Sequence, residues 1–131
     1  MRVIKFKAWD KVRTKMYDSV FYSYHRQTGI MNLSTEFGVL NFSERNAFEL
    51  MQYTGLKDKN NKEIYEGDII KIPNSEMYSR VFFEKGCFMI ENYHKICIKF
   101  RGKIEVICSN PLSNEVIGNI HQNPELLEEK E

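Results

Sequence analysis

The first part of the chain alternates hydrophobic and polar residues, a pattern that predicts strands. In residues 3–9 the alternation places Ile4 and Phe6 on the inward face of a half-buried strand. Residues 10–15 are polar and predict a turn. Residues 16–24 are rich in Tyr, Phe and Val and predict a second strand. We expect the two strands to pair as a hairpin.

The segment after this hairpin is less regular. Residues 27–29 predict a turn, and residues 30–33 form a short apolar run. Residues 43–51 match two patterns. Ser43 is suited to cap a helix of about two turns. The alternation instead favours a strand over residues 49–53, after at most a short helical turn.

The central segment carries the clearest turn signals. Residues 58–62 combine Asp, Asn and Lys, and Asn tolerates the left-handed backbone of a tight turn. Short strands are predicted over 63–65 and 69–72, with a bend at Gly67 between them. Asp68 is well placed to accept backbone N–H groups and fix that bend. The predicted structural turn residues are Gly55, Asp58, Asn60, Asn61, Gly67 and Asp68.

The remaining chain predicts a meander of short strands that ends in a helix. Two hairpins are expected. In the first, strands over 81–83 and 87–90 flank a turn at 84–86. In the second, strands over 96–100 and 104–107 flank a turn at 101–103. A final strand is expected over 115–120. The short helix is predicted over 123–127, with Asn123 as its N-cap and Pro124 at the first helical position.

Short strands with frequent turns are typical of small barrels and sandwiches. At 131 residues the chain fits a single domain, 1–131. We predict a mainly β fold with one or two short helices. An N-terminal β ribbon (1–48) precedes a small twisted β-barrel body (49–131), which carries the short C-terminal helix.

Charge and composition narrow the function classes. The chain has 19 Lys and Arg against 18 Asp and Glu, a net charge of +1. This balance argues against strong non-specific binding of nucleic acid but leaves room for a local basic face. The N-terminal segment lacks the apolar core of a signal peptide, and no segment approaches the ~20 apolar residues of a membrane span. A cytoplasmic protein with no membrane partner is expected.

The cysteines do not match a metal site. Cys87, Cys97 and Cys108 are separated by nine and ten residues, whereas zinc ligands usually come in closely spaced pairs. Even with His94 nearby, we expect the thiols to pack as small hydrophobes in apolar strands. A Cys–His nucleophile pair is disfavoured, because no helix start or basic cluster lowers a thiol pKa. No metal and no cofactor is predicted.

Several segments resemble the YopX family. The most specific is LMQYTGLKDKNNKEIYEGDII over residues 50–70. Residues 4–10, 115–120 and 123–127 also resemble the family. The central turn has Asn-Asn where the family usually has Asn-Gly. The resemblance implies a small, mostly β product of phages and prophages of low-GC Gram-positive bacteria. It implies no assigned activity, so no catalytic or binding residue carries over.

The most distinctive surface prediction is a candidate binding patch around this central motif. Its aromatic rings would stack on bases or contact a peptide, and its lysines would meet phosphates. The patch consists of Gln52, Tyr53, Lys57, Lys59, Lys62 and Tyr65. In the alternative interpretation Gly55 closes a tight turn, Leu56 fills the barrel and the lysines keep a loop soluble.

Three acids surround the predicted bend at Gly67, namely Glu63, Glu66 and Asp68. Paired acids hold divalent ions or perform acid–base chemistry. This keeps open a metal-dependent phosphodiesterase or nuclease that uses Glu66 and Asp68. A structural role for Asp68 in the bend is favoured, and no catalytic residue is predicted.

The leading functional hypothesis is therefore a non-enzymatic phage or prophage accessory protein. It would bind a host or phage protein, or nucleic acid. The sequence has no phosphate-binding glycine loop and no nucleophile signature. A homo-oligomeric structural protein is the third hypothesis, because exposed strand edges favour self-association.

Overall fold

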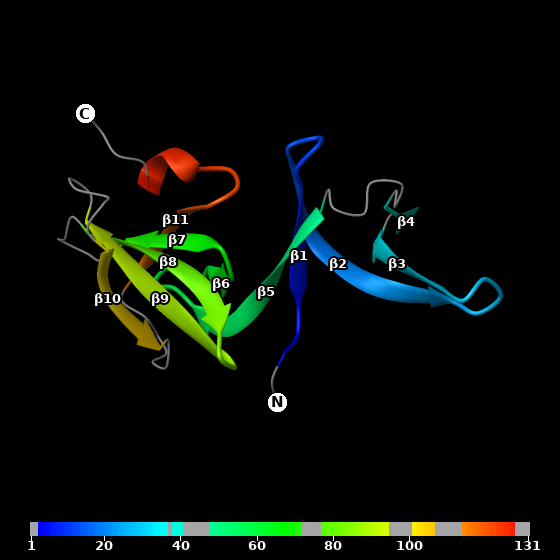
Figure 1. Ribbon diagram of the computed structural model, residues 1–131, viewed down its shortest axis with the longest axis horizontal. Coiled ribbons are helices and arrows are strands. Elements are labelled where there is room, and N and C mark those ends of the chain that lie inside the picture. The colour runs from blue at the N-terminus through cyan, green and yellow to red at the C-terminus, as the bar shows by residue number, and fades with distance from the viewer. Residues whose placement is uncertain are drawn as a thin grey trace. The chain divides into compact units, whose positions relative to one another are not determined.

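The computed structural model describes residues 3–36, 38–40, 48–71, 77–94, 101–106 and 114–127. These residues form antiparallel sheets and one short 3-10 helix (Figure 1), so the mainly β prediction is confirmed. The chain divides into two compact units, Met1–Tyr53 and Thr54–Glu131. Within the described ranges, no helix has the length and apolar character needed to cross a membrane.

The first unit is built from antiparallel strands in the spatial order β4-β3-β2-β1-β5. They are β1 (Phe6–Asp10), β2 (Lys15–His25), β3 (Ile30–Thr35), β4 (Gly38–Val39) and the first part of β5 (Phe48–Lys57). The predicted hairpin of β1 and β2 is confirmed. The predicted strand over 49–53 lies within β5, which pairs with β1 from Phe48 to Gln52.

A register shift between β1 and β2 shapes the core of this unit. Phe6 pairs with Val20 but Ala8 pairs with Tyr17, so β2 carries one extra residue, as in a β-bulge. Because of this extra residue, Tyr17 and Val20 reach the same core despite their odd spacing. Ala8, Val20 and Leu33 form the buried cluster. The partly buried side chains around it are Phe6, Tyr17, Leu40, Phe48 and Leu50.

The second unit contains the rest of β5 and a five-stranded sheet in the order β10-β9-β8-β7-β11. Its elements are β6 (Glu63–Tyr65), β7 (Asp68–Lys71), β8 (Met77–Glu84), β9 (Cys87–His94), β10 (Arg101–Val106), β11 (Glu115–Asn119) and the helix η1 (Pro124–Leu127). The predicted β8–β9 hairpin is confirmed. Lys85 and Gly86 form its turn, both with positive φ.

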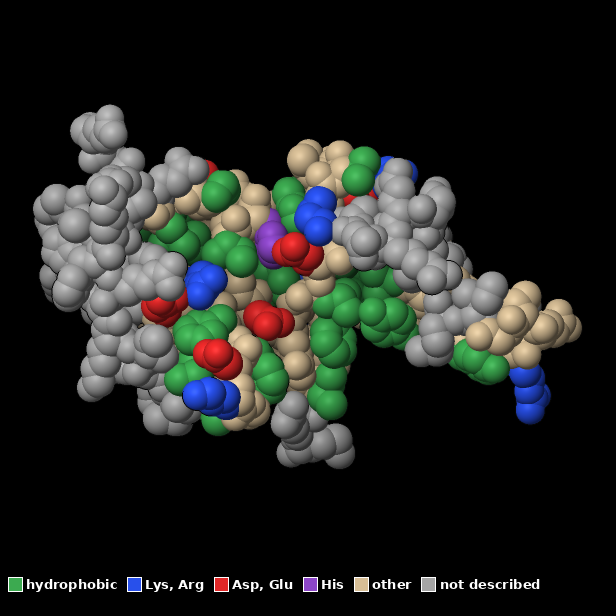
Figure 2. Space-filling model, in the orientation of Figure 1, with side chains coloured by type: hydrophobic (Ala, Val, Ile, Leu, Met, Phe, Trp, Pro, Cys, Tyr) green, Lys and Arg blue, Asp and Glu red, His purple; other side chains and the backbone are tan. Residues whose placement is uncertain are grey.

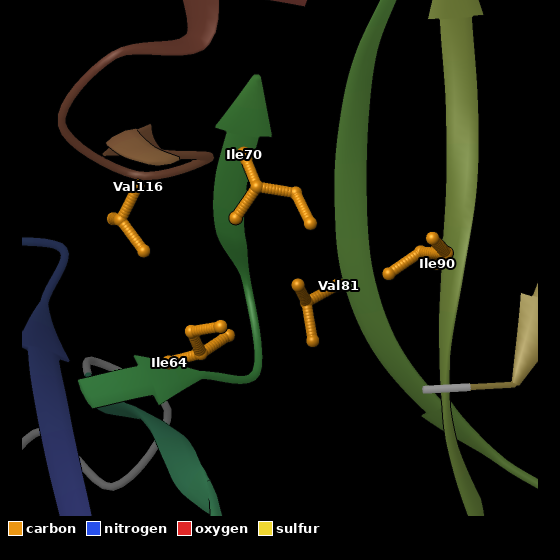
Figure 3. Packing of buried hydrophobic residues seen from close by; sticks show 5 residues of the cluster. All are labelled: Ile64, Ile70, Val81, Ile90 and Val116. Atoms are coloured by element: carbon orange, nitrogen blue, oxygen red, sulfur yellow. The ribbon is translucent and has the colours of Figure 1, made fainter. Parts of the chain in front are cut away.

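Branched aliphatic side chains from five different strands fill the core of the second unit. They are Ile64, Ile70, Val81, Ile90 and Val116. Figure 3 shows these side chains turned toward one another from β6, β7, β8, β9 and β11. β-branched residues suit the pleated surface of a sheet, which explains the Ile and Val composition. Leu56 packs against this cluster, as the alternative interpretation of the central motif expects.

Two strand predictions need correction. Ile4 is exposed and precedes β1, because pairing with β2 and β5 begins at Phe6. Residues 101–103 form no hairpin turn and instead open β10. The β10–β9 register shifts between Arg101 and Ile104, so the glycine there lies at an irregularity inside the strand. The predicted strand over 96–100 lies outside the described residues, as do residues 43–47 of the alternative helix.

Gly55 lies within β5, although the sequence places it in a tight turn. Its φ is +89°, which an L side chain rarely adopts. Next to it, the Thr54 hydroxyl donates to the Ile64 carbonyl at 2.8 Å and accepts from the Leu56 N–H at 3.2 Å. The strand therefore continues through a local irregularity that the threonine side chain holds in place.

The C-terminal strand and helix are present as predicted, but the cap differs. Pro124 is the first residue of η1. The Asn123 side-chain oxygen accepts from the Asn119 N–H at 3.3 Å. The Asn123 side chain therefore bonds the end of β11. The Asn123 backbone carbonyl accepts the Leu126 N–H at 3.1 Å.

Candidate functional site

The two tyrosines of the predicted binding patch are buried. Tyr53 is 7% exposed and Tyr65 is 3% exposed. The Lys5 ammonium lies 5.1 Å from the centre of the Tyr53 ring, and the Tyr65 hydroxyl donates to Glu63 at 3.2 Å. Buried rings cannot stack on a base or a peptide, so this part of the predicted patch is corrected. Their neighbour Gln52 is half-buried on β5.

The three predicted lysines are exposed, in and beside the loop between β5 and β6. They are Lys57, Lys59 and Lys62. The Lys59 ammonium lies 3.8 Å from the Glu115 carboxylate, with both side chains 44% exposed. This acid offsets part of the positive charge of the loop. An exposed pair of this kind contributes little to stability.

Asp58 organises this loop from a buried position, as the turn prediction requires. One carboxylate oxygen accepts the N–H groups of Asn60 at 2.8 Å and Lys62 at 2.9 Å. The other accepts the Val116 N–H at 2.9 Å. Asn61 has a φ of +66°, the left-handed backbone predicted for the central turn. Asp58 thus connects the loop to β11.

Burial raises the pKa of Asp58, because it disfavours the charged carboxylate. The backbone N–H groups of Val116, Lys62 and Asn60, together with the Lys62 charge, lower that pKa by more. The net result is a pKa below the ordinary aspartate value. Asp58 is therefore a charged structural group whose oxygens are already occupied by backbone donors.

Asp68 also uses its carboxylate within the fold. Its side-chain oxygen accepts the Tyr65 N–H at 2.8 Å, across the bend at Gly67, whose φ is +90°. The Gly67 N–H in turn donates to the Val81 carbonyl at 2.8 Å. This geometry is the bend-fixing role that the sequence favours for Asp68. In the part of the chain that the structure describes, no three His, Cys, Asp or Glu side chains are grouped for a metal ion.

Cys87 is exposed at the start of β9. The sequence prediction that its thiol packs in the core is therefore wrong. Cys87 pairs in register with Glu84, next to the β8–β9 turn. Cys97 and Cys108 lie outside the described residues, so their predicted packing remains a prediction.

A surface that the sequence analysis missed lies at the far end of the β2–β3 hairpin. β1 pairs with β2 only as far as Val20. Beyond it, residues 21–25 of β2 pair with residues 30–34 of β3, and we call this segment the aromatic ribbon. β4 pairs with β3 at Ser34 and Thr35, so among the described strands the ribbon is two-stranded from Tyr22 onward. Phe21 is 50% exposed, Tyr22 55% and Tyr24 63%. Figure 2 shows hydrophobic side chains on the surface over this hairpin.

The aromatic ribbon carries aromatic side chains on both faces. Neighbouring strand residues point to opposite faces, so Phe21 and Tyr22 lie on different sides. The Ser23 and Ser34 hydroxyls lie 2.8 Å apart and join the two strands. The sequence did contain a signal for this surface, because Val20, Phe21 and Tyr22 make both faces of one strand apolar.

An open hollow of about 470 Å³ lies at the base of the same strand. It is lined by Lys15, Met16, Tyr17, Asp18, Ser19, Thr35, Glu36, Gly38 and Leu40. The Lys15 ammonium lies 4.9 Å from the centre of the Tyr17 ring. The hollow therefore combines apolar walls with two carboxylates and one ammonium group.

The YopX protein family model matches residues 5–128, nearly the whole chain. The chain belongs to the YopX family. None of the curated proteins matches it. Among solved structures, it is similar to the crystal structure of protein EF1440 from Enterococcus faecalis, with 24% identity and a TM-score of 0.64. The similarity covers 98% of this chain and 100% of that one, and it shows a shared fold.

In this YopX protein, the segments that carry the family resemblance contain structural groups. Asp58 and Asp68 bond backbone N–H groups, as described above. Asn119 is a third such residue. In the turn after β11, its side-chain oxygen accepts the backbone N–H groups of His121 at 3.0 Å and Gln122 at 2.8 Å. The recognisable motifs of the YopX chain thus maintain its fold, and the aromatic ribbon lies apart from them in the sequence.

Proposed function

We propose that this YopX-family chain is a non-enzymatic phage or prophage accessory protein that binds a partner protein through the aromatic ribbon. The observation that carries the proposal is the exposure of Phe21, Tyr22 and Tyr24 on this ribbon, which among the described strands is two-stranded from Tyr22 onward. An isolated two-stranded hairpin is only marginally stable in water, so aromatic side chains on both of its faces favour a covering partner. Tyr and Phe are also enriched at the centres of protein interfaces.

The size of the aromatic surface suits the centre of an interface. A buried aromatic side chain removes about 150–250 Å² from water, so three half-exposed rings offer roughly 300 Å². A standard interface buries about 800 Å² on each partner, and a few central aromatic residues supply most of its binding energy. The aromatic ribbon would form that centre, and the rest of the contact would lie around it.

Charge favours protein over nucleic acid as the partner. Residues 19–24 carry no charged side chain, so a polyanion meets no cation along this stretch. The exposed lysines of the β5–β6 loop are the feature that would favour nucleic acid, but Glu115 offsets one of them.

We propose that the protein acts in the cytoplasm of the host bacterium.

The test is affinity capture from host lysate with the full chain as bait. The wild-type chain is expected to retain a specific protein that survives nuclease treatment. The double variant Tyr22→Ser with Tyr24→Ser is expected to lose it. A matched control is Val12→Ser, which removes an exposed apolar side chain from a different loop of the same unit. Equal capture by both variants would contradict the proposal.

Two outcomes would favour the competing functions. Magnesium-dependent cleavage of DNA or RNA that is lost in Asp68→Asn would support a phosphodiesterase or nuclease. A stable oligomer in light scattering, dissolved by the two tyrosine substitutions, would show that the ribbon binds a second copy of this chain.

A further inference from the structure

We propose that the hollow at the base of β2 receives a cationic side chain, Lys or Arg, from the same partner segment that covers the aromatic ribbon. This inference rests on the proposed function. It specifies the partner segment further, because the segment must carry a basic residue in addition to the apolar residues that cover the ribbon.

The walls of the hollow suit such a side chain. Its volume of about 470 Å³ lies in the range of sites that hold small ligands. Met16, Tyr17 and Leu40 offer apolar surface. Lys and Arg side chains bury their methylene stems against apolar surface while the charged head reaches a polar partner.

The charges of the hollow favour a cation over an anion. Asp18 and Glu36 contribute two carboxylates, and both residues are exposed, so an incoming head group can reach them. Lys15 is the cation among the lining residues, and its ammonium lies over the Tyr17 ring. Among the described lining residues the net charge is negative, so a guanidinium or ammonium group is favoured over a phosphate or carboxylate, which would face two like charges.

The hollow and the aromatic ribbon follow each other along one strand. Ser19 lines the hollow, and Phe21 begins the ribbon two residues later. A strand rises about 3.4 Å per residue, so Asp18 and Tyr22 are separated by at most roughly 14 Å, because the β-bulge between Tyr17 and Val20 shortens this stretch. An extended partner segment that runs along β2 would thus carry its basic residue about three to six positions from its apolar residues.

The test selects binders of the immobilised full chain from a library of random short peptides displayed on phage. Peptides selected by the wild type are expected to be enriched in aromatic or aliphatic residues. They are also expected to carry Lys or Arg at the stated spacing. Asp18→Asn with Glu36→Gln should keep the apolar preference and lose the basic one. A synthetic selected peptide should bind this variant about two- to five-fold more weakly.

Glu84→Gln with Glu125→Gln is the matched control, because it neutralises two exposed acids far along the chain from the hollow. It should leave both preferences unchanged. If peptides selected by the wild type show no preference for Lys or Arg, this inference is overturned but the proposed function is not. The same holds if the Asp18 and Glu36 variant selects peptides with the same basic preference. If no peptide depends on Tyr22 and Tyr24, the proposed function fails, and this inference fails with it.

Discussion

The two units use a buried aspartate in different ways. In the first unit, Asp10 accepts the N–H groups of Val12 and Arg13, and it pairs with the Arg13 guanidinium, all at 3.0 Å. These partners lie within three residues, in the turn after β1. In the second unit, Asp58 reaches Val116, which is 58 positions away. The same residue type stabilises a local turn in one unit and a long-range connection in the other.

Hydrophobic surface is also distributed differently between the units. The core of the second unit combines side chains from five strands. Its exposed large hydrophobic residue, among those described, is Phe83. The first unit exposes Phe21, Tyr22 and Tyr24 on the ribbon alone. Among the described residues, the second unit therefore buries most of its large hydrophobic side chains, whereas the first leaves three aromatic side chains of the ribbon exposed, the surface that we propose contacts a partner.

The largest expected effect tests the long-range role of Asp58. Asp58→Ala leaves three N–H groups near the protein interior without their acceptor, so it should lower the free energy of unfolding by about 3–5 kcal/mol. Asp10→Ala should cost less, about 1–2 kcal/mol, because its loop can relax toward solvent. Urea unfolding of both variants measures the difference. Equal losses would remove the contrast between the units.

A smaller effect is expected where the second unit packs closely after β11. A Cβ atom on Gly118 would lie 2.5 Å from the Asn123 side-chain oxygen and 3.0 Å from its Cβ. Gly118→Ala should therefore displace Asn123, at a cost of about 1–3 kcal/mol. In a double-mutant cycle with Asn123→Ala, the combined loss should be smaller than the sum of the two. Additive losses would show that this contact is not the cause.

The acid dependence of stability should also follow from Asp58. The pKa of Asp58 is lowered in the folded state, so its contribution is present above the unfolded aspartate pKa and is lost as pH falls through the folded value. The difference in unfolding free energy between wild type and Asp58→Asn should therefore shrink below about pH 4. Burial raises the pKa of Asp10, but the hydrogen bonds from Arg13 and Val12 and the Arg13 charge lower it by more, so the net shift has the same sign as that of Asp58. A difference that stays constant down to about pH 2 would contradict this account.

The smallest expected effect on stability belongs to the aromatic ribbon. Tyr22→Ser with Tyr24→Ser should change the free energy of unfolding by less than about 1 kcal/mol, because both side chains are already more than half exposed. Thermal unfolding checks this value. A large loss would mean that the tyrosines serve the fold, and it would weaken the case for a binding surface.

Much of the fold could be predicted because its signals are local. These signals are the Asp, Asn and Lys run at 58–62, the glycines at 67 and 86, and the aromatic and aliphatic residues of β1, β2 and β11. Each depends only on a residue and its near neighbours. The short helix at 124–127 follows from proline at its first position. Two of the errors lie at Gly55 and residues 101–103, where a glycine marks an irregularity inside a strand. Sequence signals for a turn and for such an irregularity are the same.

The candidate site was predicted less well, because exposure depends on distant parts of the chain. Tyr53 and Tyr65 look like surface aromatics in a lysine-rich segment, yet other elements cover them. Tyr22 and Tyr24 look like core residues of a strand, yet β1 pairs with β2 only as far as Val20. A strand pattern shows which residues share a face, but it does not show whether anything lies over that face.

The order of residues along the chain was thus sufficient to establish the β class, most turns and the family, since these depend on short-range preferences and on motifs. The tertiary structure was needed to show that Asp58 accepts a hydrogen bond from Val116, which lies 58 positions away in the sequence. It was also needed to show that the central tyrosines are covered and the β2 aromatics are not. Burial is set by contacts between residues far apart in the sequence, and no local pattern encodes which of those contacts form.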